Sequence, residues 1–221
     1  STIAPITLRR MGAGHDSTEL GEYASASALR ELVMQGKLTE AMTHLPPSCR
    51  EVYQKAWEAG ECFAPAYAER SQLAALRRMT VGDLARLPDI SEGLENRIYA
   101  ALRTGTSMEA VLDAVKTKRY SRARLRRILL CAWLGVTSEM SAGEPPYIHI
   151  LGMNRRGQEI LAQVGQGVSL PLSHSLMRLS QTGERAKAFA QLESTADDLY
   201  ATGTNLVQPC GKDYTNGIIK L

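Results

Sequence analysis

The chain has 221 residues, of which 44% are hydrophobic and 22% are charged, and its formal net charge at pH 7 is +3. This composition is typical of a folded globular protein and excludes a largely disordered chain; the length suits one large domain or two smaller ones. The longest uninterrupted apolar run, Ile128 to Val136, has nine residues, whereas a bilayer span needs about 20, so a cytoplasmic protein without membrane contact is expected.

The amino-terminal region is predicted to join a strand to two short helices. Apolar residues recur near the start as in one strand of a larger sheet, at Ile3, Ile6 and Leu8. A helix is expected from about Ala26 to Gln35, with Ser25 as its N-cap and Gly36 after its end. A second, shorter helix ends before Pro46.

Helices are predicted to dominate the middle of the chain. Their expected ranges are 47–60, 65–79, 81–87, 90–103, 107–116 and 122–134. Two of the starts have the cap-x-x-acid spacing of a capping box, Thr80 with Asp83 and Thr106 with Glu109.

The carboxy-terminal tail alternates strand and helix patterns after the linker signal "SAGEPP". Strands are expected at "YIHILGM" and "VSLPLSHS", and helices at "RRGQEILAQV" and "GERAKAFAQLESTADDLYA". The fold class predicted is therefore mainly α with a small α/β tail, divided into residues 1–45, 46–140 and 141–221.

No metal site or disulfide framework is predicted. The four cysteines lie far apart, without a C-x-x-C pair or a histidine at ligand spacing: Cys49, Cys62, Cys131 and Cys210. Buried free thiols are expected at all four positions.

A cationic block, "KTKRYSRARLRR", covers residues 116–127 and holds seven cations and no acid. A helix over 122–134 places one apolar stripe toward a core, formed by Leu125, Ile128, Leu129, Ala132 and Trp133. The cations surround the start of that helix, where the helix dipole is already positive, so an anion is expected there. Without acids in the block for i,i+4 pairing, a merely solvated face is less favoured than phosphate contact. The predicted nucleic-acid surface is Lys116, Lys118, Arg119, Tyr120, Arg122, Arg124, Arg126 and Arg127, with the Tyr120 ring offered to a sugar or base; RNA and DNA both remain open on this argument.

A second pattern favours DNA, because "LARLPDISEGLENRIYAAL" (84–102) resembles a helix-hairpin-helix module. That module wants glycines where this chain has Asp89 and Ser91, and an acidic side chain repels phosphate. The alternative is structural, with Asp89 and Glu92 capping a helix whose apolar face toward a core is Leu94, Ile98, Ala101 and Leu102. A non-catalytic nucleic-acid-binding module of this type is the alternative function.

The segment "YASASALR" (23–30) is similar to the Ile-Ser-Ser-Thr-x-Ile-Arg signature of the HIGH-motif nucleotidylyltransferase superfamily. Ser25, Ser27, Leu29 and Arg30 occupy matching places, whereas Ala24 and Ala26 depart from it. Three further segments follow the order of the bacterial tRNA(Met) cytidine acetate ligases, and the chain resembles that family over most of its length: Arg10–Gly14, Glu92–Asn96 and Lys118–Arg127.

The resemblance implies the end of a Rossmann-like domain followed by a helical domain, and a two-step reaction. Acetate attacks ATP, with Mg²⁺ expected, to give acetyl-adenylate and pyrophosphate; the wobble cytidine of elongator tRNA(Met) then takes the acetyl group. The ATP site implied consists of Arg10, Met11, Ser25, Ser27 and Arg30, and the cationic block would seat the tRNA.

One superfamily element is missing from these 221 residues, the His-x-Gly-His nucleotide motif. The histidines are isolated from one another at positions 15, 44, 149 and 174. The chain is therefore expected to be the carboxy-terminal portion of the enzyme, inactive without an amino-terminal half that would be its partner. No catalytic residue is assigned from the sequence.

Overall fold

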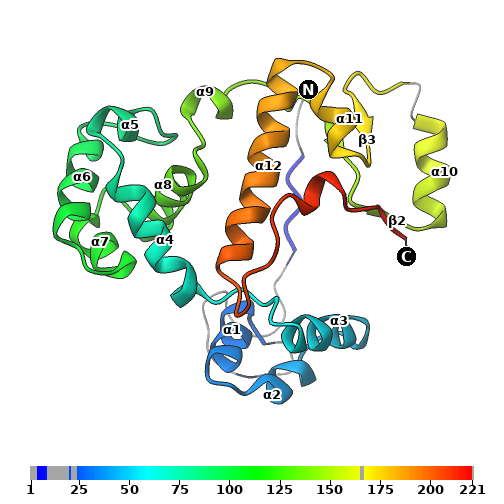
Figure 1. Ribbon diagram of the computed structural model, residues 1–221, viewed down its shortest axis with the longest axis horizontal. Helices are drawn as coiled ribbons and strands as arrows, with labels where there is room; N and C mark the ends of the chain where they lie inside the picture. Colours follow the sequence, from blue (N-terminus) through cyan, green and yellow to red (C-terminus); the bar gives the residue numbers. More distant parts are fainter. Residues whose placement is uncertain (1–3, 9–19, 21–23, 165–166, 221) are drawn as a thin grey trace. The chain divides into compact units, whose positions relative to one another are not determined.

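The computed structural model describes residues 4–8, 20, 24–164 and 167–220 (Figure 1). The chain divides into two compact units, residues 1–62 and 63–221. In the described part, no helix has both the length and the apolarity to cross a membrane.

In its described residues the first unit has three helices, α1 (Ala26–Met34), α2 (Leu38–Thr43) and α3 (Pro47–Glu58). α1 packs on α2, and the buried residues of the pair are Ala28, Leu32, Ala41 and Met42. Residues 4–8 have no regular secondary structure, and Ile6 and Leu8 are 86% and 88% exposed. The predicted strand is therefore wrong for these residues, since a strand needs a partner for its backbone groups and none of the described chain pairs with them.

The second unit begins with six helices, α4 (Pro65–Arg77), α5 (Val81–Ala85), α6 (Leu94–Thr104), α7 (Met108–Val115), α8 (Arg122–Leu134) and α9 (Ser138–Ser141). The buried apolar faces of α4 to α8 form one core that includes Leu76, Leu84, Leu102 and Ile128, whereas α9 has no buried residue. The stripe predicted for α8 is confirmed: Leu125, Ile128, Leu129 and Ala132 are buried, with Trp133 half-buried.

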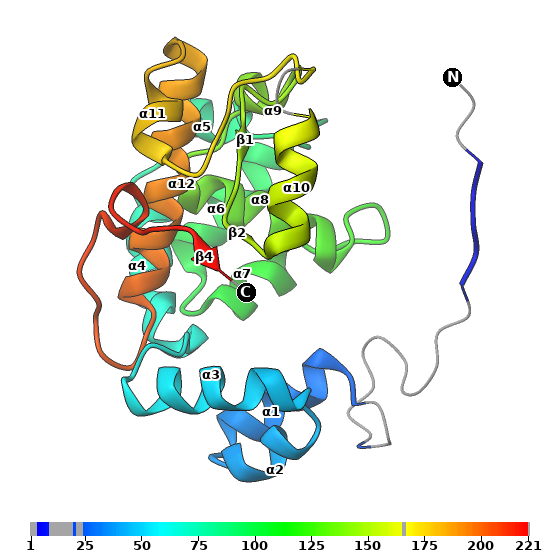
Figure 2. The same ribbon diagram turned by 90° about the vertical axis from the view of Figure 1, so that its right-hand side faces the viewer.

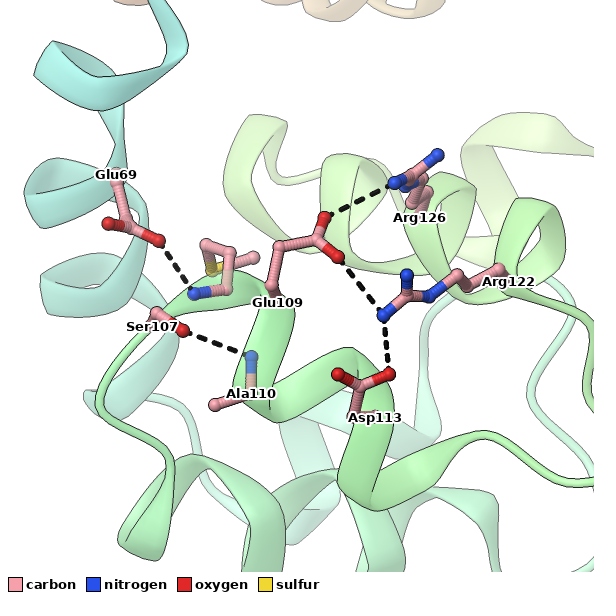
Figure 3. A network of polar contacts seen from close by, with 8 residues as sticks. Glu69, Ser107, Glu109, Ala110, Asp113, Arg122 and Arg126 are labelled. Carbon is pink, nitrogen blue, oxygen red and sulfur yellow. Dashed lines mark hydrogen bonds and ion pairs between the residues drawn. The ribbon is translucent and has the colours of Figure 1, made fainter. Parts of the chain in front are cut away.

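The helix starts agree with the sequence in part. The capping box of Thr80 with Asp83 is present in both directions. The box predicted for Thr106 is wrong, because Ser107 is the N-cap of α7 and its Oγ accepts the Ala110 N–H at 3.0 Å. The Glu69 carboxylate from α4 also accepts the Met108 N–H, at 2.8 Å, so a tertiary contact satisfies a backbone donor at this helix start (Figure 3).

α6 begins at Leu94 and not at Ile90, because the residues before it form a left-handed turn. Asp89, Glu92 and Gly93 have φ angles of 62°, 57° and 78°, in a region that β-carbons disfavour. No side chain caps α6, so the predicted capping by Asp89 and Glu92 is wrong. The apolar face of α6 is confirmed as core.

The carboxy-terminal lobe (residues 141–221) combines helices with very short strands (Figure 2). Its elements are β1 (Ile148–His149), β2 (Gly152–Met153), α10 (Arg155–Val164), β3 (Leu172–Ser173), α11 (Leu176–Ser180), α12 (Glu184–Thr202), a 3-10 helix η1 (Lys212–Tyr214) and β4 (Ile219–Lys220). β1 pairs with β3 and β2 with β4, both in parallel. α10 and α12 lie where the sequence predicted helices, whereas the predicted strands shrink to pairs of residues and α11 was not expected.

The long helix α12 joins the lobe to the helical region, because it contacts α11 as well as α4 and α8. Residues 63–221 consequently form a single compact unit. The division into residues 1–45, 46–140 and 141–221 stays a prediction about functional regions.

Candidate functional site

The start of α1 carries three of the five residues assigned to the ATP site. Ser25 is the N-cap, buried to 1% exposure, and its Oγ accepts the Ala28 N–H at 3.0 Å. Such a cap contributes about 1 kcal/mol to helix stability. Ser27 is half-buried and Arg30 is exposed. Helix N-termini bind anions through their free backbone N–H groups, so a phosphate site at this end of α1 is chemically reasonable.

The other two residues, Arg10 and Met11, lie outside the described residues. A cavity of about 440 Å³ in the first unit is lined by both α1 and α2, including Ala28, Glu31, Leu32 and Lys37. Ser25, Ser27 and Arg30 are not among its lining residues. The cavity therefore does not coincide with the three described residues of the predicted ATP site.

The cationic surface consists of the seven cations of residues 116–127: Lys116, Lys118, Arg119, Arg122, Arg124, Arg126 and Arg127. Ser121 caps α8 through its Oγ, which accepts the Arg124 N–H at 3.3 Å. The side chains of Arg122 and Arg124 are half-buried and the other five are exposed. α8 therefore presents most of these cations to solvent while its apolar stripe is in the core.

Tyr120 does not belong to this exposed set. It is 5% exposed and belongs to the helical core, and the Arg124 guanidinium lies 5.4 Å from the centre of its ring. The expectation that the ring faces a sugar or base is wrong for this structure, because the ring fills the core beneath the cationic surface.

Acids from another helix pair with this surface. Arg122 bridges Asp113 and Glu109 of α7, with 3.0 Å to the Glu109 carboxylate, and Arg126 reaches the other Glu109 oxygen at 3.2 Å (Figure 3). The sequence argument held these cations to be unpaired because residues 116–127 contain no acid. In the fold, acids from α7 pair with two of them, so that argument does not hold.

The left-handed turn before α6 supplies the remaining partners. Arg127 contacts the Asp89 carboxylate at 3.0 Å, and Arg119 is ion-paired with Glu92. Arg124 donates to the Asp89 carbonyl at 2.6 Å and to the Ser91 Oγ at 3.2 Å. Arg119, which precedes α8, and Arg124 and Arg127 on α8 thus hold the turn that resembles a helix-hairpin-helix.

These ion pairs leave the surface able to bind an anion. The carboxylate side chains are 48–67% exposed, and exposed pairs contribute only about 0–1 kcal/mol each. Exchanging such a partner for a phosphate oxygen is therefore inexpensive. Lys116 and Lys118 form no ion pair within the described chain, and the seven cations outnumber their four acidic partners by three.

One cation of this region was missed by the sequence reasoning. Arg97 of α6 is exposed and donates to the Val115 carbonyl at 3.4 Å, at the end of α7 and directly before Lys116. It extends the cationic surface onto α6. Its position on the polar side of the α6 pattern is visible in the sequence, but its neighbour is 18 residues away.

Metal ligation finds no support in the described residues, where no group of three or more His, Cys, Asp or Glu side chains is placed to hold an ion. The cysteines are free thiols, but the expected burial is wrong for Cys49 and Cys210, which are exposed, and Cys62 and Cys131 are half-buried. Burial raises the pKa of Cys62 and of Cys131, so these two thiols are less ionised, and therefore less reactive, than an ordinary cysteine.

Comparison with known proteins places the chain in a class. The family model of the HIGH nucleotidyl transferases matches residues 1–213. The chain therefore belongs to the HIGH nucleotidyl transferase family.

The particular relatives are tRNA(Met) cytidine acetate ligases, which confirms the resemblance inferred from the sequence. The ligase of Thermoanaerobacter sp. (strain X514) is 30% identical over 224 residues, which cover all of this chain and 55% of that protein. The ligase of Acetivibrio thermocellus is 29% identical, over 99% of this chain and 56% of that protein. The chain thus spans about half the length of the curated relatives it matches.

Solved structures agree with these sequence matches. The apo form I crystal structure of Thermotoga maritima TmcAL superposes with a TM-score of 0.87 at 25% identity, over 97% of this chain and 55% of that one. The form II structure of the same protein, bound with alpha-thio ATP, gives a TM-score of 0.81, also at 25% identity, over 91% and 53%.

Proposed function

We propose that this chain is part of an ATP-dependent ligase that activates acetate as acetyl-adenylate and acetylates the wobble cytidine of elongator tRNA(Met). Within that enzyme, this chain binds the tRNA and supplies part of the ATP site. The observation that carries the proposal is the exposed cationic surface of α8, which is held in place by exchangeable acids. The ligase relatives and the ATP analogue in the neighbouring structure support the reaction class.

The first step would use the start of α1. A carboxylate oxygen of acetate attacks the α-phosphorus of ATP, the bond to the β-phosphate breaks, and pyrophosphate leaves, with Mg²⁺ entering alongside ATP. Negative charge grows on the leaving phosphates, and positive groups fixed in advance stabilise it more in the transition state than in the ground state. Arg10, Arg30 and the N-terminal amides of α1 would take this role, with Ser25, Ser27 and Met11 shaping the pocket.

The second step would use the cationic surface. Guanidinium groups bind phosphate oxygens of the tRNA backbone and position the anticodon without reading its sequence. The cytidine N4 then attacks the acetyl carbonyl, AMP leaves, and the amine loses a proton to a base that we do not assign.

Acetate-dependent exchange of pyrophosphate into ATP tests the assignment. We expect no exchange with the 221-residue chain alone, because it lacks a His-x-Gly-His motif, and exchange with a protein that also carries the amino-terminal half. Exchange by the chain alone would show that the missing half is not needed. A longer protein without acetate-dependent exchange would remove the ligase assignment.

The helix-hairpin-helix alternative is not favoured. The residues of its turn are held by Arg124 and Arg127 of the same chain, and Asp89 places a carboxylate where that module offers backbone amides to phosphate. The relatives found are ligases. Binding of duplex DNA as tight as that of tRNA would reopen this alternative.

Neutralising Glu109 is expected to strengthen tRNA binding. Glu109→Gln releases Arg122 and Arg126 from one of their acidic partners, so affinity should rise about threefold, the effect of roughly 0.6 kcal/mol. Glu95→Gln is the matched control, because its carboxylate accepts from Asn96 and pairs with no arginine of α8. Filter binding measures the tRNA affinity of both variants. An equal rise in affinity in the two would show a general charge effect and not release of the arginines.

A further inference from the structure

A second cavity, of about 410 Å³, lies in the carboxy-terminal lobe among β1, β3, η1 and β4. Its volume is within the ~300–1,000 Å³ typical of small-molecule sites. Four polar side chains line it: His149, His174, Asp213 and Asn216. His149 ends β1 and His174 follows β3, and these strands are parallel. Both imidazoles therefore emerge at the carboxyl edge of a parallel pair, where ligands of α/β folds bind.

The ring nitrogen of His149 that is left for a ligand follows from its contact with Glu193. Its Nδ1 lies 2.5 Å from the Glu193 Oε1, and the other Glu193 oxygen accepts from the Tyr147 hydroxyl at 2.9 Å. Burial and Glu193 raise the pKa of Tyr147, so its hydroxyl keeps its proton and remains a donor. A carboxylate only accepts, so Nδ1 of His149 carries a proton, and Nε2 is the ring nitrogen left for a ligand.

The other polar groups of the cavity are available to a ligand. Within the described chain, the side chains of His174, Asp213 and Asn216 form no hydrogen bond or ion pair, and no lysine or arginine is among the lining residues. Burial, and then the nearby carboxylates of Asp197 and Glu193, raise the pKa of Asp213, an effect that His149 opposes and Asp198 adds to. Among the described residues, the Asp213 carboxylate is therefore an unpaired acceptor in a cavity that no lysine or arginine lines, which disfavours phosphate and carboxylate ligands and favours N–H donors.

The rest of the lining is apolar. Leu151 and Ile219 border the cavity and are 65% and 62% exposed. Apolar side chains beside a few polar groups suit a flat ring whose edge is hydrogen-bonded.

We propose that this cavity binds a nucleobase with an exocyclic amine, cytosine or adenine, whose amine donates to the Asp213 carboxylate. The Asn216 amide can donate to the adjacent ring nitrogen, and His149 and His174 supply the remaining polar edge. Uracil has a carbonyl oxygen in place of the amine, which would face the carboxylate with a second acceptor. This site is separate from the residues of the proposed ATP and tRNA surfaces and does not depend on the ligase assignment.

NMR titration of the ¹⁵N-labelled 221-residue chain with cytidine and with uridine tests the proposal. We expect cytidine to shift the resonances of the lining residues with a Kd on the order of 1 mM, and uridine to bind at least about fivefold more weakly. Titration with a short oligocytidylate distinguishes the two sources of the base. If the oligonucleotide binds more tightly than cytidine, the natural ligand is a base within RNA; if the two bind equally, it is a free nucleoside. Both outcomes support the amine-bearing base.

Two charge-neutralising variants sharpen the test. Asp213→Asn should weaken cytidine binding at least about fivefold and remove the preference over uridine, since an amide can also donate to a carbonyl oxygen. Asp197→Asn is the matched control, because it removes the same charge beside Asp213 without removing a lining group; its preference for cytidine should persist.

Asp213→Asn is expected to fold. The pKa of Asp213 is raised above its ordinary value of 3.8, because the folded protein favours the protonated form. The stability that this form contributes is present at low pH and is lost as pH rises through the folded-state pKa, so the ionised carboxylate costs stability at pH 7. The neutral amide removes this cost at pH 7, and the Tm should stay equal or rise by about 1–3 °C. Equal binding of cytidine and uridine, no effect of Asp213→Asn, or shifts caused by Mg²⁺ but not by cytidine would each overturn the proposal.

Discussion

Replacing the five exposed cations of the α8 surface with glutamine is expected to weaken elongator tRNA(Met) binding by about 100- to 1,000-fold. The residues are Lys116, Lys118, Arg119, Arg126 and Arg127, all solvent-exposed. Each cation that binds a phosphate in the native protein contributes to the salt dependence of binding. Removing it should reduce the slope of log K, where K is the tRNA association constant, against log salt by about 0.7–0.9. A salt series of binding measurements, read beside the thermal unfolding curve, separates weaker phosphate binding from impaired folding.

The matched control neutralises five exposed cations elsewhere: Lys55, Arg70, Arg155, Lys187 and Lys220. It changes the net charge equally, so an electrostatic attraction of the whole chain would weaken equally in both variants. We expect affinity to fall by less than about threefold in the control. The same salt slope in both variants would contradict the role given to this surface.

Tyr120 should behave as a core residue and not as a stacking platform. Tyr120→Ala is expected to lower the free energy of unfolding by about 3–5 kcal/mol, because it removes a ring that is 5% exposed. Tyr120→Phe should leave both stability and tRNA affinity nearly unchanged. The phenyl ring still fills the core and still lies beneath Arg124, and the Tyr120 hydroxyl forms no hydrogen bond within the described chain.

Urea denaturation and tRNA binding of the two Tyr120 variants together decide whether the Tyr120 ring is a core residue or an RNA contact. A destabilisation by Tyr120→Ala of less than about 1 kcal/mol would show that the ring is not part of the core. A marked fall in tRNA affinity in Tyr120→Phe, with unchanged stability, would mean that its hydroxyl reaches the RNA.

Regular elements were predictable where one local pattern decides them. The stripe of α8 follows from its i, i+3, i+4 spacing, and Leu125 and Ile128 are buried as that spacing predicts. The caps Ser25 and Thr80 are close to their backbone partners in sequence, so they were found as well. The start of α6 was misplaced because Asp89 and Glu92 adopt left-handed conformations that their residue types do not announce.

The strands show where a local pattern is insufficient. Ile6 and Leu8 belong to an apolar sequence pattern, yet residues 4–8 have no partner strand in the described chain. The strands of the lobe are two residues each and depend on partners far along the chain, as β2 does on β4. Strand formation needs those partners, so alternation alone overestimated it.

The sequence by itself determined the concentration of seven cations in residues 116–127, the helical periodicity beneath them and the family resemblance that the comparisons confirmed. Each of these depends on residues that are neighbours along the chain. Only the tertiary structure decided that Asp89, Glu92, Glu109 and Asp113 meet those arginines and that Tyr120 faces the core. The partners of Arg127 and Arg126 lie 38 and 17 residues away, and such pairs form because the packing of α6, α7 and α8 around one apolar core brings their polar faces together.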